Sequence, residues 1–544
     1  MAKWVPLNTL AEIWEAIADQ QPRALALVHG DETQDWAAFD NRAARFAAAL
    51  AAAGVRPRAT VALDLFNCSE YLECFYGCLK SRAASANVNY RYTAGELRAL
   101  LAAAQAEVLV YHASLADRVA SALTGGATGL RLLVQIDDVG GAEVPPGAVG
   151  YEQLLAAHEP APRIARSDDD YFIGFTGGTT GLPKGVLYTI GPNTTMALRN
   201  RTVVLGEHIA PDAPVLETVA ELARAGALPR SVPASPLMHS TGLTFASLPC
   251  LAAGGAVVTL QNRSFDPHEL LETVQAWRVA AIGIVGDAFA RPMVHALAER
   301  FAAGNPYDTS SLRTIASAGV AWSADVKQAL LQHIPQVALS DSCGSTEGAF
   351  YGNRVVRAGD EPATAVFRAQ PGVQVVDADR RALPIGEVGL LASPVPTSGY
   401  FNDPQATARV FYDSDGVRYA IPGDFGRLNG DGSITLIGRG TSTINTGGEK
   451  VHPEEVEQVL QQLPEVEDCL VFGTPHERFG QQVTAIVQPV TGHDPSADTL
   501  RAAAREQLAA YKVPRRIVFG AVPRLPNGKP DFETARAVAA GDAG

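Results

Sequence analysis

The sequence has few cysteines and no tract of clustered basic residues, and each shortage excludes a class of protein. Six cysteines in 544 residues do not make a disulfide scaffold, and no Cys-x-x-Cys pair occurs. We expect reduced, mostly buried thiols, including Cys74 and Cys78, which lie four residues apart in an expected helix. The net charge is −14, and binding to a nucleic-acid backbone requires clustered lysine and arginine. The sequence therefore argues against a nucleic-acid partner.

Long apolar runs are missing as well. No uncharged apolar run of about 18 residues occurs, so we predict no membrane span. Residues 1–6 lack the apolar centre of a secretion signal, which favours a cytoplasmic location. The hydrophobic content of 47% is nevertheless ample for large cores, and a chain of this length usually divides into two to four domains.

Hydrophobic periodicity predicts alternating short strands and helices. Apolar residues at helical spacing follow a capping Thr9 or Asn8, and a second helix is expected over 69–81. Short apolar runs predict strands over 60–66, 108–111, 131–136, 171–175, 256–260 and 281–285. This alternation predicts an α/β fold with largely parallel sheets.

The C-terminal part is expected to form a separate, small α+β domain over 441–544, after a first domain over 1–440. A strand over 431–436 is expected to end at the break Gly438-Arg439-Gly440, and Pro453 then opens a helix. Strands over 468–473, 483–489 and 516–520 and a helix over 497–510 complete the unit.

A loop rich in glycine and threonine over 176–185 carries the clearest chemical signal. It reads Thr-Gly-Gly-Thr-Thr-Gly-Leu-Pro-Lys-Gly and follows an apolar strand. Glycines let backbone N–H groups approach an anion, threonine hydroxyls add donors, and Lys184 adds a positive charge. The loop therefore suits phosphate, but it is not a Walker loop, because Pro183 precedes the lysine and Gly185 follows it. The alternative is a mobile surface loop, and the threonines and the lysine argue against it.

Three further segments carry weaker signals when each is taken alone. In Asp-Ser-Cys-Gly-Ser-Thr-Glu-Gly over 341–348, a hydroxyl and a carboxylate can hold a phosphate oxygen and Mg²⁺, although a helix N-cap at Ser345 or Thr346 is the simpler explanation. Asp424, followed by Arg439, can hold a ribose, although Gly-Asp is a common turn. Lys529, in Pro-Asn-Gly-Lys-Pro-Asp, would alone be a solvated charge.

Together, these four segments resemble, in their order, spacing and residue types, the adenylate-forming superfamily of acyl-CoA synthetases, peptide-synthetase adenylation domains and luciferases. The resemblance covers nearly the whole chain, and the loop over 176–185 matches the phosphate loop of that family almost letter for letter. It implies a large N-terminal domain of stacked α/β sheets that binds ATP and the acid. It also implies a small, mobile α+β C-terminal domain that swings on a hinge between two half-reactions.

The resemblance implies a set of contacts for ATP, or for the AMP moiety of an acyl-adenylate. The implied phosphate contacts are Thr176, Gly177, Gly178, Thr179, Thr180 and Lys184. The implied border of the adenine is Gly319, Val320, Ala321, Asp341 and Ser342, and the implied ribose contacts are Asp424 and Arg439.

The resemblance also implies the residues at the reacting centre. Thr346 would touch the α-phosphate, and Glu347 and Thr176 would bind Mg²⁺. Lys529 would reach in from the small domain and bridge the carboxylate of the acid and the α-phosphate. Positioning and charge neutralisation would then favour the departure of pyrophosphate.

A second half-reaction is implied by Asn-Thr-Gly-Gly-Glu-Lys-Val-His-Pro over 445–453. Gly447 and Gly448 would let the pantetheine thiol of coenzyme A pass close to the backbone. Lys450 would contact this anionic substrate, although a solvated surface charge explains Lys450 equally well. Ser442 stands where many members of the family carry a charged hinge residue, a departure that leaves the hinge open without indicating loss of function.

The acid pocket is implied by two segments. His239, in Pro-Leu-Met-His-Ser-Thr-Gly, would lie near the carboxylate of the acid, and a hydrogen-bonded core histidine is the alternative. Residues 285–292 would line the pocket and resemble the actinobacterial subgroup that acts on fatty, steroid or terpenoid acids. The small Gly286, Ala288 and Gly344 would leave room for a wide substrate.

The predicted function is that of an AMP-forming acid–thiol ligase, which converts a bulky or hydrophobic acid through its adenylate to the CoA thioester. Its expected partners are ATP, coenzyme A and a small carboxylic acid, and a homodimer is left open. One alternative is an adenylation enzyme that loads a carrier protein, although no Asp-Ser-Leu attachment segment follows Gly544. The others are an enzyme that only thioesterifies a supplied acyl-adenylate, and an adenylate-binding sensor. A basic or aromatic site for the adenine of coenzyme A would favour the ligase.

Overall fold

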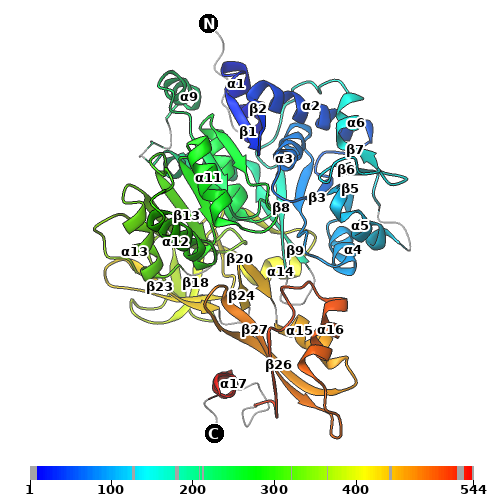
Figure 1. Ribbon diagram of the computed structural model, residues 1–544, viewed down its shortest axis with the longest axis vertical. Helices are drawn as coiled ribbons and strands as arrows, with labels where there is room; N and C mark the ends of the chain where they lie inside the picture. The colour runs from blue at the N-terminus through cyan, green and yellow to red at the C-terminus, as the bar shows by residue number, and fades with distance from the viewer. Residues whose placement is uncertain are drawn as a thin grey trace.

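The chain forms two large sheets with helices between and outside them, and a smaller third sheet in its C-terminal part (Figure 1). The computed structural model describes residues 9–124, 129–177, 183–206, 209–210, 213–319, 322–363, 365–439, 444–451, 453–523 and 532–541.

The largest sheet has 15 strands within these ranges. Its first part is parallel, apart from the hairpin of the first two strands, in the order β2 (Glu32–Asp35), β1 (Leu25–His29), β11 (Ala256–Thr259), β10 (Arg230–Pro233), β12 (Ala281–Ile284), β13 (Thr314–Ala318), β14 (Ala338–Gly344). The sheet continues with β15 (Phe350–Val356), β16 (Val366–Ala369), β23 (Ser433–Arg439), β22 (Asp424–Leu428), β18 (Gly389–Pro394), β21 (Val417–Ala420) and β20 (Phe411–Ser414), and β17 (Gln374–Val376) pairs with β18.

This second part of the sheet is antiparallel, so the prediction of largely parallel sheets is wrong for it. The reason is that most of its strands follow one another through short turns, which only antiparallel neighbours can use, instead of through helical crossovers.

The second sheet has eight strands in the described part of the chain. Their order is β19 (Thr397–Tyr400), β9 (Pro183–Thr189), β8 (Tyr171–Gly177), β4 (Ala84–Asn87), β3 (Thr60–Asp64), β5 (Ala106–His112), β6 (Leu132–Ile136), β7 (Val149–Gly150). The strands from β8 to β7 are parallel, as predicted, while β19, β9 and β8 are antiparallel to one another.

Helices separate and cover the two sheets. The layer between them contains α1 (Leu10–Gln20), α2 (Trp36–Ala52), α3 (Ser69–Ser81) and α10 (Leu248–Ala252). The 15-stranded sheet is covered on its other face by α11 (Pro267–Trp277), α12 (Gly286–Ala302) and α13 (Ala324–His333), and the eight-stranded sheet by α4 (Ala94–Ala103) and α5 (Ala116–Leu123) (Figure 1). The shorter helices are α6 (Tyr151–Ala156), α7 (Ile190–Arg199), α8 (Arg201–Leu205), α9 (Val215–Arg224) and a π-helical turn (Thr241–Ser247). The predicted stacked α/β sheets are confirmed.

Local sequence signals explain where several elements begin. Thr9 accepts a hydrogen bond from the backbone N–H of Glu12, and the Glu12 carboxylate accepts from the backbone of Thr9, so the predicted Thr9 cap is confirmed as a capping box. The helix predicted over 69–81 is α3, with the same bounds. The strand predicted over 60–66 ends earlier, at Asp64.

The C-terminal part forms a separate sheet that has five strands within the described residues. They are β25 (Glu449–Val451), β24 (Ile444–Thr446), β27 (Gly480–Pro489), β26 (Val466–His476) and β28 (Arg516–Phe519). One face packs on α15 (Pro453–Gln461) and α16 (Ala497–Gln507), and the other on α17 (Phe532–Ala540). This α+β unit is as predicted, although the helix predicted to reach 510 ends at Gln507. The predicted break at Gly438-Arg439 is wrong, because β23 runs to Arg439.

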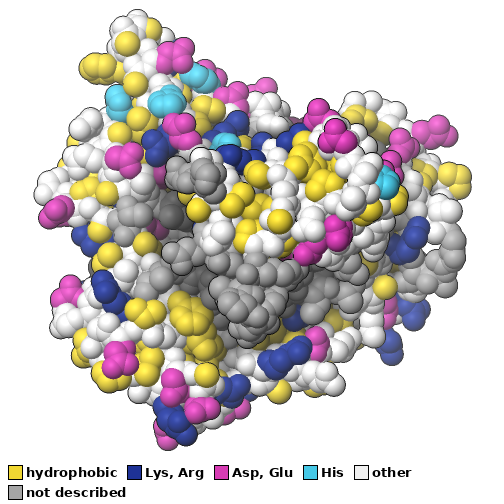
Figure 2. Space-filling model, turned by 90° about the horizontal axis from the view of Figure 1, so that it is seen from below, with side chains coloured by type: hydrophobic (Ala, Val, Ile, Leu, Met, Phe, Trp, Pro, Cys, Tyr) yellow, Lys and Arg dark blue, Asp and Glu magenta, His cyan; other side chains and the backbone are white. Residues whose placement is uncertain are grey.

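The surface and the cysteines agree with the composition. All six cysteines are buried and free. Dark blue and magenta side chains are scattered over the lower face in Figure 2, with hydrophobic side chains between them, so the coloured residues of this face form no broad basic surface. Within the described ranges, no helix combines the length and the apolar character that crossing a bilayer demands.

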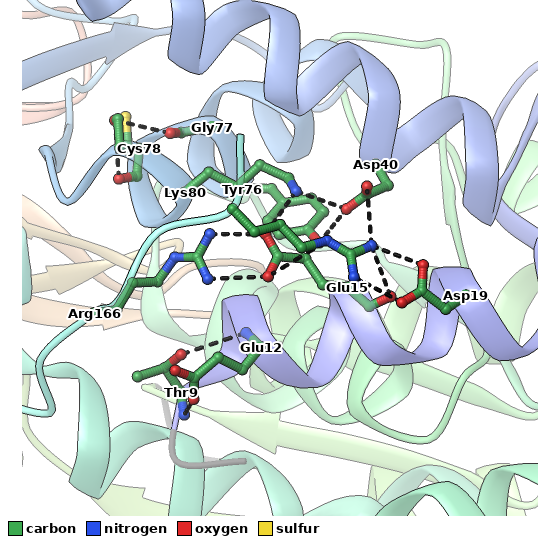
Figure 3. A network of polar contacts seen from close by, with 12 residues as sticks. Thr9, Glu12, Glu15, Asp19, Asp40, Tyr76, Gly77, Cys78, Lys80 and Arg166 are labelled. Carbon is green, nitrogen blue, oxygen red and sulfur yellow. Dashed lines mark hydrogen bonds and ion pairs between the residues drawn. The ribbon is translucent and has the colours of Figure 1, made fainter. Parts of the chain in front are cut away.

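A buried ionic network ties α1, α2 and α3 together (Figure 3). The Lys80 ammonium lies 2.9 Å from the Glu15 carboxylate and 2.7 Å from that of Asp40. The Arg166 guanidinium donates to both oxygens of Glu15, at 3.0 and 2.7 Å, and the Tyr76 hydroxyl donates to Asp40 at 2.5 Å. Lys80, Glu15 and Arg166 of this network therefore face counter-charges with side chains that are almost fully buried.

Lys80→Met is expected to destabilise the protein by about 3–5 kcal/mol, because it removes the buried cation that pairs with both carboxylates. Arg166 still pairs with Glu15, but among the described residues Asp40 keeps only the Tyr76 hydroxyl and Arg163 at 3.9 Å. Urea unfolding, followed by the fluorescence of Trp14, whose ring lies 5.0 Å from that of Tyr76, would measure the loss. Arg381→Met is the control: its pair with Asp379 has both side chains more than two-thirds exposed, and it should cost less than about 1 kcal/mol. Equal losses in the two variants would contradict a stabilising role for the network.

Candidate active site

A cavity of about 1410 Å³ lies where the three sheets meet. Its wall includes the carboxyl ends of β13 and β14, strand β8 and the β24–β25 hairpin, and ligands of open α/β sheets bind at such strand ends. The residues predicted from the sequence that line it are His239, Gly319, Asp341, Ser342, Thr346, Asp424, Gly448 and Lys450. Residues more than 200 positions apart in the chain thus share one wall.

The loop predicted to bind phosphate connects two antiparallel strands. Thr176 pairs with Lys184 and Gly177 with Pro183 across β8 and β9. The tip of the loop, including Gly178, Thr179 and Thr180, lies outside the described residues, as do the side chains of Thr176 and Gly177. The Lys184 ammonium lies 5.6 Å from the centre of the Tyr400 ring, which places a cation at the loop end of the hairpin.

Thr346 and Glu347 lie in the turn that connects β14 to β15. The Ser345 backbone N–H donates to the Ala349 carbonyl at 2.8 Å, and no helix follows, so the helix-cap explanation is wrong. The Tyr188 hydroxyl donates to the Thr346 carbonyl.

Tyr400 connects this turn with the phosphate loop. Its hydroxyl donates to Oε1 of Glu347 at 2.9 Å, while its ring faces the ammonium of Lys184. Tyr400 therefore contacts Glu347 through its hydroxyl and Lys184 through its ring, and these two residues come from different predicted segments.

Glu347 fits a Mg²⁺ ion that arrives with a nucleotide. Magnesium in phosphoryl-transfer sites is usually held by one or two carboxylates together with phosphate oxygens and water. The described residues contain no group of three or more acidic, histidine or cysteine side chains that would hold an ion by itself. A single carboxylate beside a phosphate loop matches the first arrangement.

The predicted ribose and adenine residues lie on the largest sheet. Asp424 accepts a hydrogen bond from the Tyr351 hydroxyl at 2.7 Å, and its backbone pairs with that of Arg439, whose side chain lies outside the description. Gly319 has a φ of +94° at the end of β13, a conformation that favours glycine. Val320 and Ala321 lie outside the described residues.

Asp341 is held by a lysine that the sequence analysis did not single out. The fully buried Lys327 ammonium lies 2.6 Å from Oδ2 of Asp341 and also donates to a backbone carbonyl at 3.0 Å. Burial raises the pKa of Asp341 to about 6, in spite of the opposing effect of Lys327. This pair fixes the strand end beside Gly319, where Asp341 lines the cavity.

The C-terminal sheet contributes a tight turn to the cavity. Gly447 and Gly448 connect β24 to β25 with φ of +59° and +89°. A Cβ atom on Gly448 would lie 3.1 Å from Cγ1 of Val285, and one on Gly319 would lie 3.9 Å from the same atom. Val285 thus separates the C-terminal turn from the predicted adenine border by the width of one side chain.

His239 faces the same turn. Its Nε2 lies 3.4 Å from Oε1 of Glu449, and the Arg91 guanidinium lies 2.7 Å from that same oxygen. Burial opposes the ionisation of Glu449, but His239 and Arg91 outweigh it and lower the pKa of the carboxyl group. The histidine is therefore hydrogen-bonded and also lines the cavity, so its two interpretations are compatible.

The wall of the acid pocket differs from the prediction. Of the described residues over 285–292, only Val285 lines the cavity, because residues 286–292 form the start of α12. Gly344 lines it, as expected for a wide pocket, whereas Gly286 and Ala288 do not. Apolar and aromatic side chains of α3, β8, α7 and the π-helical turn supply much of the wall: Tyr71, Phe75, Phe172, Met196, Leu243 and Phe245.

Several contacts of the site had no signal in the sequence. Tyr351, Tyr400 and Lys327 hold predicted residues that are 73, 53 and 14 positions away in the chain. No motif surrounds them, and only the tertiary fold brings them together, since Lys327 comes from helix α13 and Tyr400 from β19 of the other large sheet. Lys529 and the predicted hinge residue Ser442 lie outside the described residues.

Comparison with known proteins places these observations in a family. The family model "AMP-binding enzyme" matches residues 14–401, and "AMP-binding enzyme C-terminal domain" matches residues 455–529. The chain is 35% identical over 540 residues to a medium/long-chain-fatty-acid–CoA/3-oxocholest-4-en-26-oate–CoA ligase of Mycobacterium tuberculosis, covering 98% of this chain and 96% of that protein. It is 34% identical to a 3-oxocholest-4-en-26-oate–CoA ligase of Rhodococcus rhodochrous, covering 97% and 95%. Among solved structures, the amide bond synthetase McbA of Marinactinospora thermotolerans has a TM-score of 0.79 at 25% identity, covering 97% and 99%.

Proposed function

Since the chain belongs to the AMP-binding enzyme family of adenylate-forming proteins, we propose that it is an acyl-CoA ligase acting on a bulky or hydrophobic carboxylic acid. The acid is first joined to AMP, with loss of pyrophosphate, and the acyl group then passes to the thiol of coenzyme A. The observation that carries the proposal is the shared cavity, which is lined by part of the predicted nucleotide set (Gly319, Asp341, Ser342, Thr346 and Asp424) and by Gly448 of the C-terminal glycine turn.

In the first half-reaction, the protein mainly positions the two substrates and neutralises the charge of the phosphates. Lys184 and the loop around it would hold the β- and γ-phosphates, and Thr346 the α-phosphate. When bound with ATP, Mg²⁺ neutralises phosphate charge, and Glu347 would hold it. Lys529 would approach both the acid and the α-phosphate and stabilise the charge that develops as pyrophosphate leaves.

In the second half-reaction, the turn at Gly447 and Gly448 would border the path of the pantetheine arm. The absence of side chains lets a chain of methylenes and amides pass close to the backbone, and both glycines have positive φ. The turn's contact with Val285, beside Gly319, supports a path that ends next to the adenylate.

Coenzyme A, in preference to a carrier protein, is supported by a basic and aromatic cluster next to this turn. The Phe479 carbonyl accepts from the Gly447 backbone N–H at 3.0 Å. Around the Phe479 ring lie the guanidinium groups of Arg515 and Arg478, at 4.4 and 5.3 Å from its centre, and the His476 ring, at 4.8 Å. Stacking surfaces with guanidinium groups suit a purine and its phosphates.

The class of the acid is supported by the cavity and by the relatives. A pocket for a drug-sized ligand usually measures about 300–1,000 Å³, so a cavity of about 1410 Å³ can hold a nucleotide and a large acyl group together. The relatives are named for medium- and long-chain fatty acids and for a cholesterol-derived acid. The aromatic and aliphatic wall of the cavity would bind the apolar part of such acids by burying its surface.

Two separate assays test the proposal. In the first, protein, Mg·ATP and a panel of fatty and steroid acids, without coenzyme A, should yield acyl-AMP and pyrophosphate by mass spectrometry. In the second, synthetic acyl-AMP and coenzyme A, without ATP, should yield acyl-CoA and AMP. If only the second assay yields product, the protein catalyses thioesterification of a supplied acyl-adenylate and not adenylation. Product in the first alone, with transfer to a carrier protein but not to coenzyme A, would replace the ligase by a carrier-loading enzyme.

A further inference from the structure

Glu449, the first residue of β25, contacts three side chains that belong to the first 440 residues of the chain. It accepts from Arg91 at 2.7 Å on Oε1 and from Asn89 at 3.1 Å on Oε2, and Nε2 of His239 lies 3.4 Å from Oε1. Its side chain is only 5% exposed. A buried carboxylate is costly unless it is paired, so this position depends on the partners across the interface.

We infer that Glu449 is a positioning residue that makes His239 the proton acceptor for the thiol of coenzyme A. The inference rests on the proposed function, because it concerns the second half-reaction of that ligase. Glu449 belongs to the C-terminal hairpin, so it can orient His239 only when this hairpin faces the cavity.

The hydrogen bond selects the tautomer of the imidazole. A carboxylate accepts hydrogen bonds, so a neutral His239 must carry its proton on Nε2 to bond to Glu449. The lone pair is then on Nδ1, for which no hydrogen-bond partner occurs among the described residues. His239 lines the cavity, and its side chain is 32% exposed, so this nitrogen is available to a substrate.

Glu449 itself is a poor candidate for the base. Both of its oxygens already accept hydrogen bonds, and the neighbouring cation Arg91 favours its ionised form. Its pKa is lowered, so the carboxylate attracts a proton less than an ordinary glutamate does. An imidazole is nearer to the pKa that suits a general base at neutral pH.

The position of the pair relative to the path of the thiol follows from the adjacent residues. Glu449 is the next residue after Gly448, where a Cβ atom would lie 3.1 Å from Val285, and a Cβ atom on Gly319, at the predicted adenylate, would lie 3.9 Å from the same side chain. A thiol that passes Gly448 toward the acyl-adenylate therefore arrives on the side of the cavity that His239 lines.

The step balances as an acyl transfer. The S–H proton passes to Nδ1 of His239, the sulfur forms a bond to the acyl carbon, and the bond between that carbon and the phosphate oxygen breaks. AMP leaves with the electron pair. The imidazolium lies against the Glu449 carboxylate, which stabilises its charge until the proton is released to water.

The groups around Glu449 and His239 leave the pH dependence of the thioesterification rate open to a contribution from His239. Besides His239, the charged or titratable side chains that interact with Glu449 are Arg91, Tyr90, Tyr92 and Tyr511. Burial raises the pKa of all three tyrosines, so they stay neutral near pH 7, and the arginine stays charged. A fall in the rate on mild acidification would therefore report on His239 and not on these four groups.

The test is single-turnover thioester formation from preformed acyl-AMP over a range of pH. In the wild type, the rate should fall on acidification, as the imidazole takes up a proton and can no longer accept one. A carboxylate stabilises the imidazolium, so Glu449→Gln should move this acid limb down by about one pH unit. It should also slow the step about 10-fold or more at neutral pH. Glu449→Asp should restore part of the rate and of the limb.

Glu96→Gln is the matched control. Glu96 lies 2.6 Å from the Lys512 ammonium in another ion pair between the N-terminal and C-terminal parts, but it does not contact His239. Its thioesterification should keep the wild-type acid limb. Acyl-AMP formation, measured in the same samples, should stay within a few-fold of wild type in all variants and shows that they are folded.

Two outcomes would overturn the inference. If Glu449→Gln slows the step without moving the acid limb, as Glu96→Gln would if docking were weakened, Glu449 is a docking contact only. An unchanged rate and limb in Glu449→Gln would remove any role for it. Failure of the wild type to form any thioester from acyl-AMP is a different result, which would overturn the proposed function itself.

Discussion

Gly448→Trp should abolish thioester formation from a supplied acyl-adenylate, with a loss of at least about 100-fold, while acyl-adenylate formation stays within a few-fold of the wild type. Gly448 has a φ of +89°, and even a Cβ atom would lie 3.1 Å from Val285. An indole there would fill the space between the hairpin and the predicted adenylate. The first half-reaction does not require this path, so the two assays of half-reactions should separate cleanly.

Gly492→Trp controls for the strain of a side chain at positive φ. Gly492 has a φ of +90° in the same C-terminal part, but no atom lies within 4 Å of its Cβ position. This variant should thioesterify normally. If Gly448→Trp retains wild-type kinetics toward coenzyme A, the glycine turn does not border the path of the thiol.

Lys529→Ala should have the opposite effect. Acyl-AMP formation should fall by at least about 100-fold, because the only positive charge expected between the carboxylate of the acid and the α-phosphate is lost. Thioester formation from preformed acyl-AMP should continue at a rate close to that of the wild type. Pyrophosphate release, with and without the acid, measures acyl-AMP formation. The assay with synthetic acyl-AMP and coenzyme A measures thioester formation.

Arg516→Ala is the control for the loss of a cation from the C-terminal part. Arg516 is exposed on β28 and has no role in the proposed reaction. Both half-reactions should be unchanged in it. A Lys529→Ala enzyme that still forms acyl-AMP at the wild-type rate would remove this lysine from the mechanism.

Local signals predicted much of the fold. Helix α3 and the Thr9 cap depend on apolar spacing and on a capping residue, both of which are properties of a short segment. The parallel part of each large sheet follows from strands that alternate with helices. The antiparallel part after Phe350 was missed, because its short strands follow one another with little periodicity and only their pairing defines them.

The site divides in the same way. Residues in motifs, such as His239, Asp341 and Asp424, line the cavity, and the residue types of each motif are what made them recognisable in the sequence. The residues that hold two of them, Lys327 for Asp341 and Tyr351 for Asp424, come from other elements and have no local signal. The segment over 286–292 was assigned to the pocket by resemblance and instead starts a helix that covers the sheet.

The six buried cysteines have a practical consequence for measuring the enzyme. All of them are inside the folded protein, and burial raises the pKa of Cys68, Cys74, Cys78, Cys250 and Cys469, so few thiolates are available to react. A thiol-reactive dye added to the working enzyme should therefore report the consumption of coenzyme A with almost no background from the protein. The same dye should react with six thiols only after the chain is unfolded in denaturant.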